Sequence, residues 1–280
     1  MVRPTKMTIH TALLQGTELL GSAGVAVARL TAEVLLGHAL DRDRVYLYAH
    51  PEQELAEVEW LHYGRYLYER MTGKPTQYIT RRQEFYGREF RVTPDVLIPR
   101  PETEHLIEVA LPLGRAVGTM LDVGTGSGAI AATLALETGS PVFATDISPA
   151  AAAVARDNAV RLGARVDLAV CDLMDAIAPA SIDLIVSNPP YVPLRQREGL
   201  QREVRDFEPP VALYGGETGF DIYQRIVAGA PRVLRPGGWL VMELGFGCHQ
   251  RVAEMLAGWS DLRVEPDLAG IPRVIAARMA

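Results

Sequence analysis

Cysteine is scarce in this sequence, with Cys171 and Cys248 as the only two in 280 residues. Two thiols so far apart exclude a disulfide framework or a zinc site built on cysteines, and we expect no bound metal. Long apolar runs are also lacking, since none reaches the roughly 18 residues that a membrane-spanning helix needs. No basic segment followed by an apolar stretch opens the chain, as it would in a secretory signal peptide. These absences predict a cytoplasmic protein that contacts no membrane.

An excess of positive charge is absent too, because 28 Lys and Arg residues stand against 34 Asp and Glu residues, for a formal net charge of -6. Broad contact with a nucleic-acid backbone requires many cationic side chains, so we expect no direct nucleic-acid target. Residues 61–100 are a local exception, with eight basic and four acidic side chains. This stretch is either a solvated surface or a docking face for an acidic or RNA-bound partner, and the sequence leaves both open.

The chain has enough apolar material for a sizeable core, and its length favours one large domain with a smaller one. Apolar residues recur at helical spacing in the first 75 residues. A break at Gly73-Lys74-Pro75 is followed by residues rich in Tyr, Phe and Val on either side of Gly87. We therefore expect a helical N-terminal domain over residues 1–75 and a β-hairpin linker over residues 76–98. The expected helices are Ile9–Leu20, Val27–Leu40 and Glu52–Arg70, and the expected hairpin strands are Gln77–Phe85 and Glu89–Thr93.

Over residues 99–280 strands and helices are expected to alternate, which is typical of a parallel sheet covered by helices on both faces. This pattern predicts an α/β domain with seven strands. The expected strands are Thr119–Val123, Val142–Thr145, Val166–Val170, Ile182–Ser187, Trp239–Glu243, Leu262–Pro266 and Arg273–Arg278. The expected helices are Glu102–Leu111, Ala129–Glu137, Pro149–Leu162, Phe220–Val233 and Cys248–Gly258.

A glycine-rich loop, Gly124-Thr125-Gly126-Ser127-Gly128, follows the first of these strands. Glycines let the backbone approach a ligand closely. Asp146 ends the second strand, where a carboxylate can accept hydrogen bonds from both hydroxyls of a ribose. Asp172 follows the third strand and either holds the exocyclic amine of adenine or caps a loop. These elements converge at one edge of the sheet, but they fit both S-adenosylmethionine and a nicotinamide dinucleotide.

The fourth strand ends abruptly in Asn188-Pro189-Pro190-Tyr191, which we call the clamp. Two prolines fix the backbone and contribute carbonyl groups without N–H groups, so the clamp presents rigid acceptors. An amide nitrogen is a poor nucleophile because its lone pair is delocalised into the carbonyl group, so a site that methylates it must orient it. We expect the Asn188 side-chain oxygen and the Pro189 carbonyl to accept the two amide N–H groups, while Tyr191 packs on the amide plane. This arrangement needs no general base and favours methyl transfer over hydride transfer.

Further motifs, taken with the glycine-rich loop and the clamp, give the sequence its resemblance to a known family. They are Gly73-Lys74-Pro75 with Tyr78-Ile79, Phe85-Tyr86-Gly87, Leu97-Ile98-Pro99-Arg100-Pro101-Glu102-Thr103-Glu104, Phe207-Glu208-Pro209 with Ala212-Leu213, and Asp267-Leu268-Ala269-Gly270 with Arg273. With them the chain resembles, over nearly its whole length, the HemK/PrmC family of protein-(glutamine-N5) methyltransferases. The Pro99 to Thr103 segment is far more specific to the family than the glycine-rich loop.

The resemblance implies a helical N-terminal domain that docks the substrate, a hairpin linker and a seven-stranded, Rossmann-like class I methyltransferase domain. It implies methyl transfer from S-adenosyl-L-methionine, with S-adenosyl-L-homocysteine as product, to the glutamine of the Gly-Gly-Gln motif in class I peptide chain release factors. The resemblance also implies that this modification modulates translation termination. The cofactor positions of the family correspond here to Gly124, Thr125, Gly126, Ser127, Gly128, Asp146, Asp172, Leu173 and Asn188, and its substrate loop corresponds to the clamp.

Leu173 stands where the family often has an aromatic residue, which leaves the contact with adenine in question. Glu243 ends the fifth strand and either faces the glutamine site or is a surface or buried structural carboxylate, while Asp122 is expected to support the glycine-rich loop. One rival function is methylation of an exocyclic amine of nucleic acid, at adenine N6 or guanine N2, which the clamp would also suit. A nicotinamide oxidoreductase or a binding module would use only the loop and Asp146.

Overall fold

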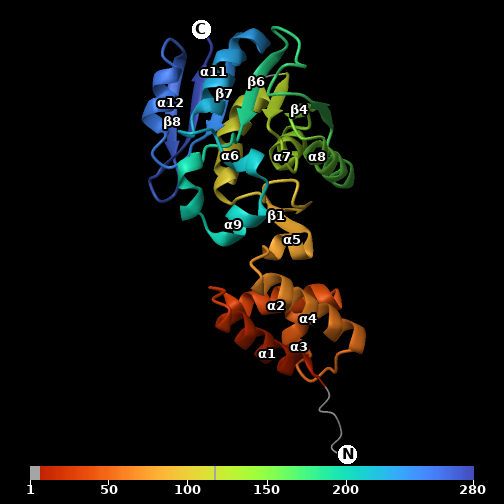
Figure 1. Ribbon diagram of the computed structural model, residues 1–280. Coiled ribbons are helices and arrows are strands. Elements are labelled where there is room, and N and C mark those ends of the chain that lie inside the picture. The colour runs from red at the N-terminus through yellow and green to blue at the C-terminus, as the bar shows by residue number, and fades with distance from the viewer. Residues whose placement is uncertain (1–6, 117) are drawn as a thin grey trace, which may run out of the picture. The chain divides into compact units, whose positions relative to one another are not determined.

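The computed structural model describes residues 7–116 and 118–280 of the chain (Figure 1). Contacts within the chain divide it into two compact units. The smaller unit contains the residues up to Arg81 together with Arg202–Phe207, and the larger unit contains Arg82–Gln201 and Glu208–Ala280. No helix in the described ranges is long and apolar enough to cross a membrane. The larger unit holds the sheet, the glycine-rich loop and the clamp, so its fold positions the site.

The smaller unit is helical, as the apolar spacing predicts. Its α1 begins after Thr8, whose side chain accepts a hydrogen bond from the Thr11 N–H group. Gly16 lets Tyr63 pack against α1, because a Cβ at Gly16 would lie 1.9 Å from the Tyr63 hydroxyl oxygen. The unit consists of α1 (Ile9–Ser22), α2 (Ala28–Leu40), α3 (Arg44–Ala49), α4 (Glu57–Met71), α5 (Thr76–Thr80) and α9 (Arg202–Phe207).

Two features of this unit differ from the sequence-based expectation. The helix expected from Glu52 begins only at Glu57, because the preceding segment pairs with the residues that lead into α1. The Ile9 N–H group donates to the Gln53 carbonyl at 3.0 Å, which gives a partner to a donor in the first turn of α1. Helix α3 was not predicted, although Asp43 caps it by accepting from the Tyr46 N–H group at 2.8 Å.

The hairpin begins later than expected. Strands β1 (Arg82–Phe85) and β2 (Arg88–Arg91) pair antiparallel around Tyr86 and Gly87, whose φ angles of 51° and 68° suit a two-residue turn of the primed type. The prediction of a strand from Gln77 was wrong, because residues 76–80 form α5. That helix ends where Arg81 adopts a left-handed conformation and its N–H group donates to the Gln77 carbonyl.

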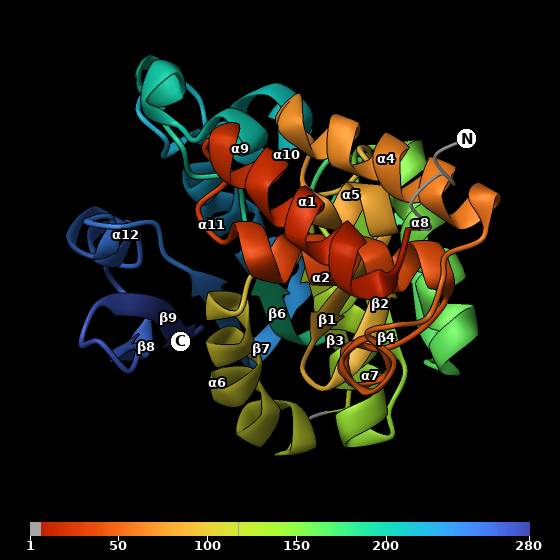
Figure 2. The ribbon, with the colours of Figure 1, turned by 90° about the horizontal axis from the view of Figure 1, so that it is seen from below.

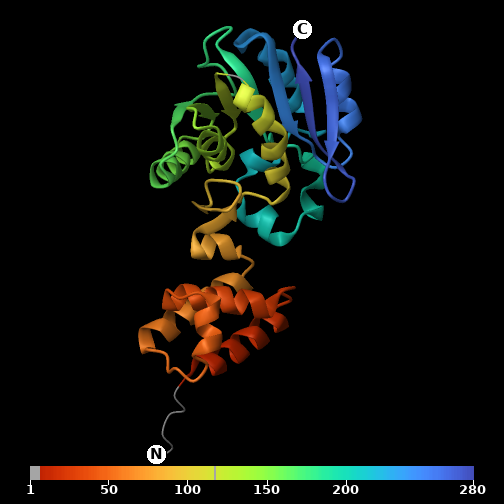
Figure 3. The same cartoon turned by 180° about the vertical axis from the view of Figure 1, so that it is seen from behind.

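Seven strands form one sheet in the order β5-β4-β3-β6-β7-β9-β8, which confirms the predicted α/β fold. The first five strands of this order run parallel, but β9 is antiparallel to both β7 and β8. A short turn joins β8 to β9, and so short a connection permits only antiparallel pairing. These two strands lie at one side of the sheet, in blue in Figure 3. The strands are β3 (Met120–Val123), β4 (Val142–Asp146), β5 (Val166–Val170), β6 (Ile182–Ser187), β7 (Leu234–Glu243), β8 (Ser260–Pro266) and β9 (Pro272–Arg278).

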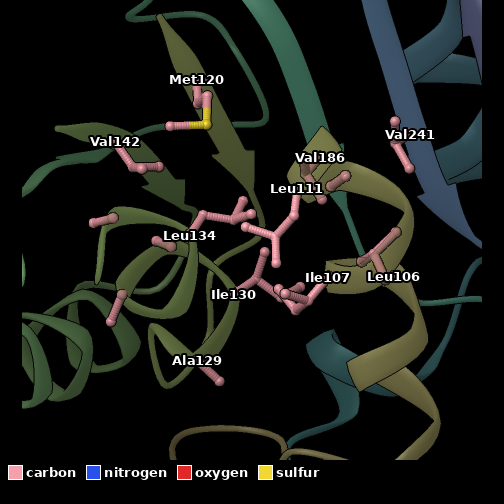
Figure 4. Packing of buried hydrophobic residues seen from close by; sticks show 14 of the residues in the cluster. Leu106, Ile107, Leu111, Met120, Ala129, Ile130, Leu134, Val142, Val186 and Val241 are labelled. Atoms are coloured by element: carbon pink, nitrogen blue, oxygen red, sulfur yellow. The ribbon is translucent and has the colours of Figure 1, made fainter. Parts of the chain in front are cut away.

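Helices cover both faces of the sheet. Along β6, Leu184 and Val186 belong to one buried cluster and Ile185 belongs to another, as alternation along a strand requires. The first cluster joins the sheet to α6 and α7, with Ile107 and Ile130 among its side chains (Figure 4). Figure 2 shows α6 beside β6 and β7. The helices of this unit are α6 (Glu102–Ala116), α7 (Ala129–Thr138), α8 (Pro149–Leu162), α10 (Pro210–Leu213), α11 (Asp221–Val233) and α12 (His249–Met255), with a short 3-10 segment η1 (Leu194–Gly199).

Asn158 of α8 ties the hairpin to the glycine-rich loop. Its side chain is fully buried. Its Oδ1 accepts from the Arg91 N–H group at 2.8 Å, and its Nδ2 donates to the carbonyl groups of Arg91 and Ser127, both at 2.9 Å. The amide therefore satisfies three backbone groups that belong to two different segments.

We expect Asn158→Ala to lower the free energy of unfolding by about 2 to 3 kcal/mol, because these backbone groups lose their partners. Urea denaturation measures the change. Asp157→Ala is the matched control, since the exposed ion pair of Asp157 with Arg91 is worth about 0 to 1 kcal/mol. Equal losses in the two variants would contradict this role of Asn158.

Candidate active site

The glycine-rich loop joins β3 to α7 and folds back on the end of β4. The φ angles of Gly124, Gly126 and Gly128 are 74°, 56° and 80°, in the left-handed region that favours glycine. The N–H groups of Gly124 and Thr125 both donate to the Thr145 carbonyl at 2.9 Å. Apart from each glycine itself and its two chain neighbours, no described residue has an atom within 4 Å of the position that a Cβ would take at Gly124 or Gly126. The loop backbone therefore faces open space there, which fits close approach by a cofactor.

Asp146 lies at the end of β4 beside this loop. Its Oδ2 accepts from the Gly126 N–H group at 2.8 Å, and its Oδ1 accepts from the Ser148 N–H group at 2.9 Å. Each carboxylate oxygen has a further lone pair, so the same side chain can also accept from two ribose hydroxyls. The structure thus brings together the loop and the acidic residue that the sequence analysis assigned to one ligand.

Asp172 and Leu173 follow β5 at the same edge of the sheet. The preceding residue, Cys171, donates its N–H group to the Asp146 carbonyl at 3.0 Å. The Asp172 carboxylate forms an ion pair with Arg225 of α11 through Oδ2 at 2.7 Å. Leu173 has a φ of 46° and packs against the second buried cluster. Asp172 therefore already has a protein partner, which the sequence did not indicate.

The clamp follows β6 and lies next to the glycine-rich loop. The Ser187 hydroxyl, just before the clamp, donates at 2.7 Å to the carbonyl of Val123, just before the loop. Gly215 and Gly219 permit close contact with the clamp backbone, since a Cβ at Gly215 would lie 2.5 Å from the Pro190 carbonyl oxygen. A Cβ at Gly219 would lie 2.4 Å from the carbonyl oxygen of the last clamp residue. Neither glycine is part of a motif that the sequence indicated.

Asn188 belongs to a hydrogen-bonded network with Thr103 and Glu243. Asn188 Nδ2 donates to Thr103 Oγ1 at 3.1 Å, and Thr103 Oγ1 donates to Glu243 Oε2 at 2.6 Å. The Tyr191 hydroxyl donates to the other carboxylate oxygen, Oε1, at a long 3.5 Å. Glu243 is 1% exposed, so the surface alternative for this residue was wrong. Three distant parts of the chain, α6, the clamp and the end of β7, meet in this network.

Burial controls the ionisation of the network. It raises the pKa of Glu243 from 4.5 to about 7, although the hydrogen bond from Thr103 and the charge of Arg273 favour the carboxylate. Burial, with the neighbouring Glu243, also raises the pKa of Tyr191 above its ordinary value. Tyr191 is therefore a neutral hydrogen-bond donor at physiological pH.

Asp122 is a second buried acid, placed behind the glycine-rich loop. Its Oδ2 accepts from the Thr125 hydroxyl at 2.6 Å and from the Ala131 N–H group at 3.1 Å. Burial raises the pKa of Asp122 to about 7. These bonds join the loop to the first turn of α7, in line with the expected supporting role.

Glu208 and Tyr223 support the network, and the sequence analysis assigned neither to the site. Glu208 is buried, binds Arg100 and accepts from the Ile98 N–H group at 3.4 Å, which holds the segment before α6. Tyr223 of α11 donates its hydroxyl to the Glu243 carbonyl at 2.7 Å. The family motifs contain Glu208 and Arg100 and could have indicated the first pair. Tyr223 gave no signal, because it is one of several buried residues on its helix.

Comparisons with known proteins match most of the chain. A family model described as the PrmC N-terminal domain matches residues 11–80, and one described as the methyltransferase small domain matches residues 103–204. A release factor glutamine methyltransferase from Koribacter versatilis is 49% identical over 276 residues, covering 97% of this chain and 99% of its own. This chain belongs to the release factor glutamine methyltransferase family. A further member, from Geobacter sulfurreducens, is 42% identical over 280 residues and covers 99% of both chains.

Solved structures of other methyltransferases share the fold of this family member. A methyltransferase from Pyrococcus furiosus aligns with a TM-score of 0.53 and 20% identity, covering 69% of this chain and 90% of its own. A 16S rRNA methyltransferase from Thermus thermophilus, in complex with AdoMet and guanosine, aligns with a TM-score of 0.52 and 21% identity, covering 71% of this chain and 50% of its own. These structures confirm the class I methyltransferase fold. The full-length relatives favour glutamine over nucleic acid as the methylated group.

The raised pKa of Glu243 predicts a pH-dependent effect of Glu243→Gln on stability. Stability from protonated Glu243 is present in full below its unfolded pKa near 4.5 and is lost as the pH rises through about 7. Glutamine carries no charge, so the variant should be more stable than the natural protein at pH 8.5 by about 1 to 3 kcal/mol, and this gain should shrink toward pH 5.

Urea denaturation at the two pH values measures this difference. The control, Glu254→Gln, changes an exposed carboxylate of α12 and should alter stability by less than about 0.5 kcal/mol at either pH. The stability difference between the variant and the natural protein is compared at the two pH values. A difference less favourable to Glu243→Gln at pH 8.5 than at pH 5 would refute the assigned direction of the pKa shift.

Proposed function

We propose that this protein transfers a methyl group from S-adenosyl-L-methionine to the side-chain amide nitrogen of a glutamine. We propose as substrate the Gly-Gly-Gln motif of class I peptide chain release factors, so that the reaction modulates translation termination. One observation carries this proposal. Asn188 Nδ2 donates to Thr103 Oγ1, whereas among the described residues no group donates to Asn188 Oδ1. An unused acceptor therefore stands at the end of β6, next to the glycine-rich loop.

The residues that would hold the cofactor are Gly124 to Gly128, Asp146, Asp172, Leu173 and Asn188. When bound, S-adenosyl-L-methionine supplies an electrophilic methyl group on a sulfonium sulfur. The open space at Gly124 and Gly126 supports this assignment, as does the carboxylate of Asp146 beside it. Leu173 offers only an apolar contact to an adenine ring, because it has no aromatic face.

The clamp would orient the substrate amide. In our proposal Asn188 Oδ1 and the Pro189 carbonyl each accept one N–H of the glutamine amide. Pro190 keeps the backbone rigid and Tyr191 packs on the amide plane. Glu243 holds Tyr191 directly and Asn188 through Thr103. Holding two reactants at near-attack distance can lower a barrier by roughly 7 to 11 kcal/mol. Orientation is the main contribution of these residues, because the amide nitrogen is intrinsically unreactive.

The proton balance follows from the same contacts. As the amide nitrogen accepted the methyl group that the cofactor supplies, with the sulfur as leaving group, the nitrogen would lose part of its conjugation and one of its protons would become acidic. In our proposal that proton would face Asn188 Oδ1 or the Pro189 carbonyl and would pass to water after transfer. No ionisable side chain is required to remove it beforehand.

We also propose that the helical residues 1–75 dock the release factor, that residues 76–98 link the two domains, and that the reaction takes place in the cytoplasm. Support comes from the match to the PrmC N-terminal domain. Large apolar side chains that remain exposed on this unit include Val45 and Tyr48 of α3 and Leu61 and Tyr68 of α4. Such side chains suit contact with a protein substrate.

Labelled methyl transfer to a purified release factor tests the proposed substrate directly. We expect label in the natural release factor and none in a variant whose Gly-Gly-Gln glutamine is replaced by alanine. Equal labelling of both proteins would refute the target assignment.

We further expect Asn188→Ala to abolish transfer, because the substrate amide loses an acceptor. Its affinity for S-adenosyl-L-methionine, measured by calorimetry, should stay within about tenfold of the natural value, or roughly 1.4 kcal/mol. A comparable loss of cofactor binding would mean that Asn188 acts mainly on the cofactor.

A further inference from the structure

The Thr103 hydroxyl joins two side chains from distant parts of the chain. It lies in the first turn of α6, donates to Glu243 Oε2 at 2.6 Å and accepts from Asn188 Nδ2 at 3.1 Å. Thr103 is 5% exposed, so little solvent reaches this contact. We call the pair of Thr103 and Glu243 the relay.

The number of hydrogens in the relay determines which end of the Asn188 amide faces it. A threonine hydroxyl has one hydrogen, and a carboxylate can only accept. Because that hydrogen is donated to Glu243, the group that Asn188 turns toward Thr103 has to be a donor, which is its NH2 end. The Oδ1 end then faces the other way. An amide rotated by 180° would place two acceptor oxygens against each other and leave Thr103 Oγ1 without a donor.

Both members of the relay are held from outside the clamp. The Tyr223 hydroxyl donates to the Glu243 carbonyl at 2.7 Å and accepts from the Gly245 N–H group at 3.2 Å, which fixes the end of β7. Glu208 binds Arg100, which fixes the segment before Thr103. Thr103 and Glu243 are therefore fixed in position, and the Asn188 amide adopts the orientation that satisfies their hydrogen bonds.

We propose that Thr103 is a positioning residue that acts with Glu243 to set the orientation of the Asn188 amide, so that Oδ1 and not Nδ2 meets the N–H group of the substrate amide. This inference rests on the proposed function, in which Asn188 accepts a hydrogen bond from glutamine. In the reversed orientation two N–H donors would face each other, and the substrate nitrogen would lose its acceptor.

Protonation of Glu243 reverses the relay. A protonated carboxyl donates to Thr103 Oγ1, and the hydroxyl hydrogen then points at Asn188 and favours the reversed amide. The groups that face Glu243 are Thr103 and Glu102 from α6, Arg273 from β9 and Tyr191 from the clamp. Arg273 favours the carboxylate, whereas Glu102 opposes it. We therefore expect kcat to fall as the pH is lowered through neutrality, and this fall should be smaller in Thr103→Val.

Thr103→Val and Thr103→Ser provide the kinetic test. Valine keeps the shape and removes the hydroxyl, so kcat should fall about 10- to 100-fold, the scale of a misplaced catalytic contact, with little change in cofactor affinity. Serine keeps the hydroxyl and should retain kcat within about threefold. Thr138→Val is the matched control, because its hydroxyl bonds the Leu134 carbonyl in α7, away from the site. Unchanged kcat in Thr103→Val, or an equal loss in Thr103→Ser, would overturn the proposal.

Nuclear magnetic resonance tests the orientation without turnover. Asn158 and Asn188 are the only asparagines in the chain, so asparagine-selective ¹⁵N labelling gives two side-chain NH2 signals, and Asn188→Ala identifies one of them. We expect a cross-peak between the Asn188 NH2 protons and the Thr103 methyl group, and slow exchange of those protons with water that becomes faster in Thr103→Val.

Absence of this cross-peak in the natural protein would overturn the inference even where Thr103→Val does not fold. The measurement needs no substrate. If the release factor proves not to be the target, the proposed function fails while the cross-peak remains. If the cross-peak is absent while glutamine is methylated, only the inference fails.

Discussion

The buried carboxylate of Glu243 is the group on which the arrangement of the site depends. A carboxylate removed from water is costly unless hydrogen bonds compensate for the lost hydration. The compensating donors are Thr103 and Tyr191, which come from α6 and from the clamp. Satisfying one buried acid therefore brings three separate segments together, and Asn188 joins them through Thr103. The interaction that offsets the burial of Glu243 is the same one that orients the clamp.

Asp122 has a parallel role under the other half of the site. Asp122 accepts hydrogen bonds from Thr125 and from the first turn of α7, and these bonds hold the glycine-rich loop in place as Glu243 holds the clamp. Burial raises the pKa of both acids to about 7, so ionisation of either acid costs stability. A bond from Ser187 to Val123 joins the two halves. The cofactor and the substrate amide would thus meet between the glycine-rich loop and the clamp, both held in fixed positions, as catalysis by orientation requires.

Much of this could be predicted from the sequence where the signal is local. Apolar runs located all seven strands, and the residues at strand ends indicated the loop, Asp146 and the clamp. Tertiary contacts overrode the local pattern elsewhere. The segment before α4 pairs with the residues that lead into α1, so α4 begins at Glu57 and not at Glu52. The segment expected to be a strand from Gln77 forms helix α5. The bond between Thr103 and Asn188 spans 85 positions in sequence and leaves no periodic pattern. Family motifs contained Thr103 but did not indicate which atoms it joins.

A crystal structure of the protein with S-adenosyl-L-homocysteine and a Gly-Gly-Gln peptide would test directly how the clamp holds the glutamine amide. We expect the glutamine amide nitrogen to lie within about 3 Å of both Asn188 Oδ1 and the Pro189 carbonyl oxygen, with Asn188 Nδ2 still bonded to Thr103. A glutamine whose carbonyl oxygen faces Asn188, or whose nitrogen has no contact with the clamp, would contradict this expectation.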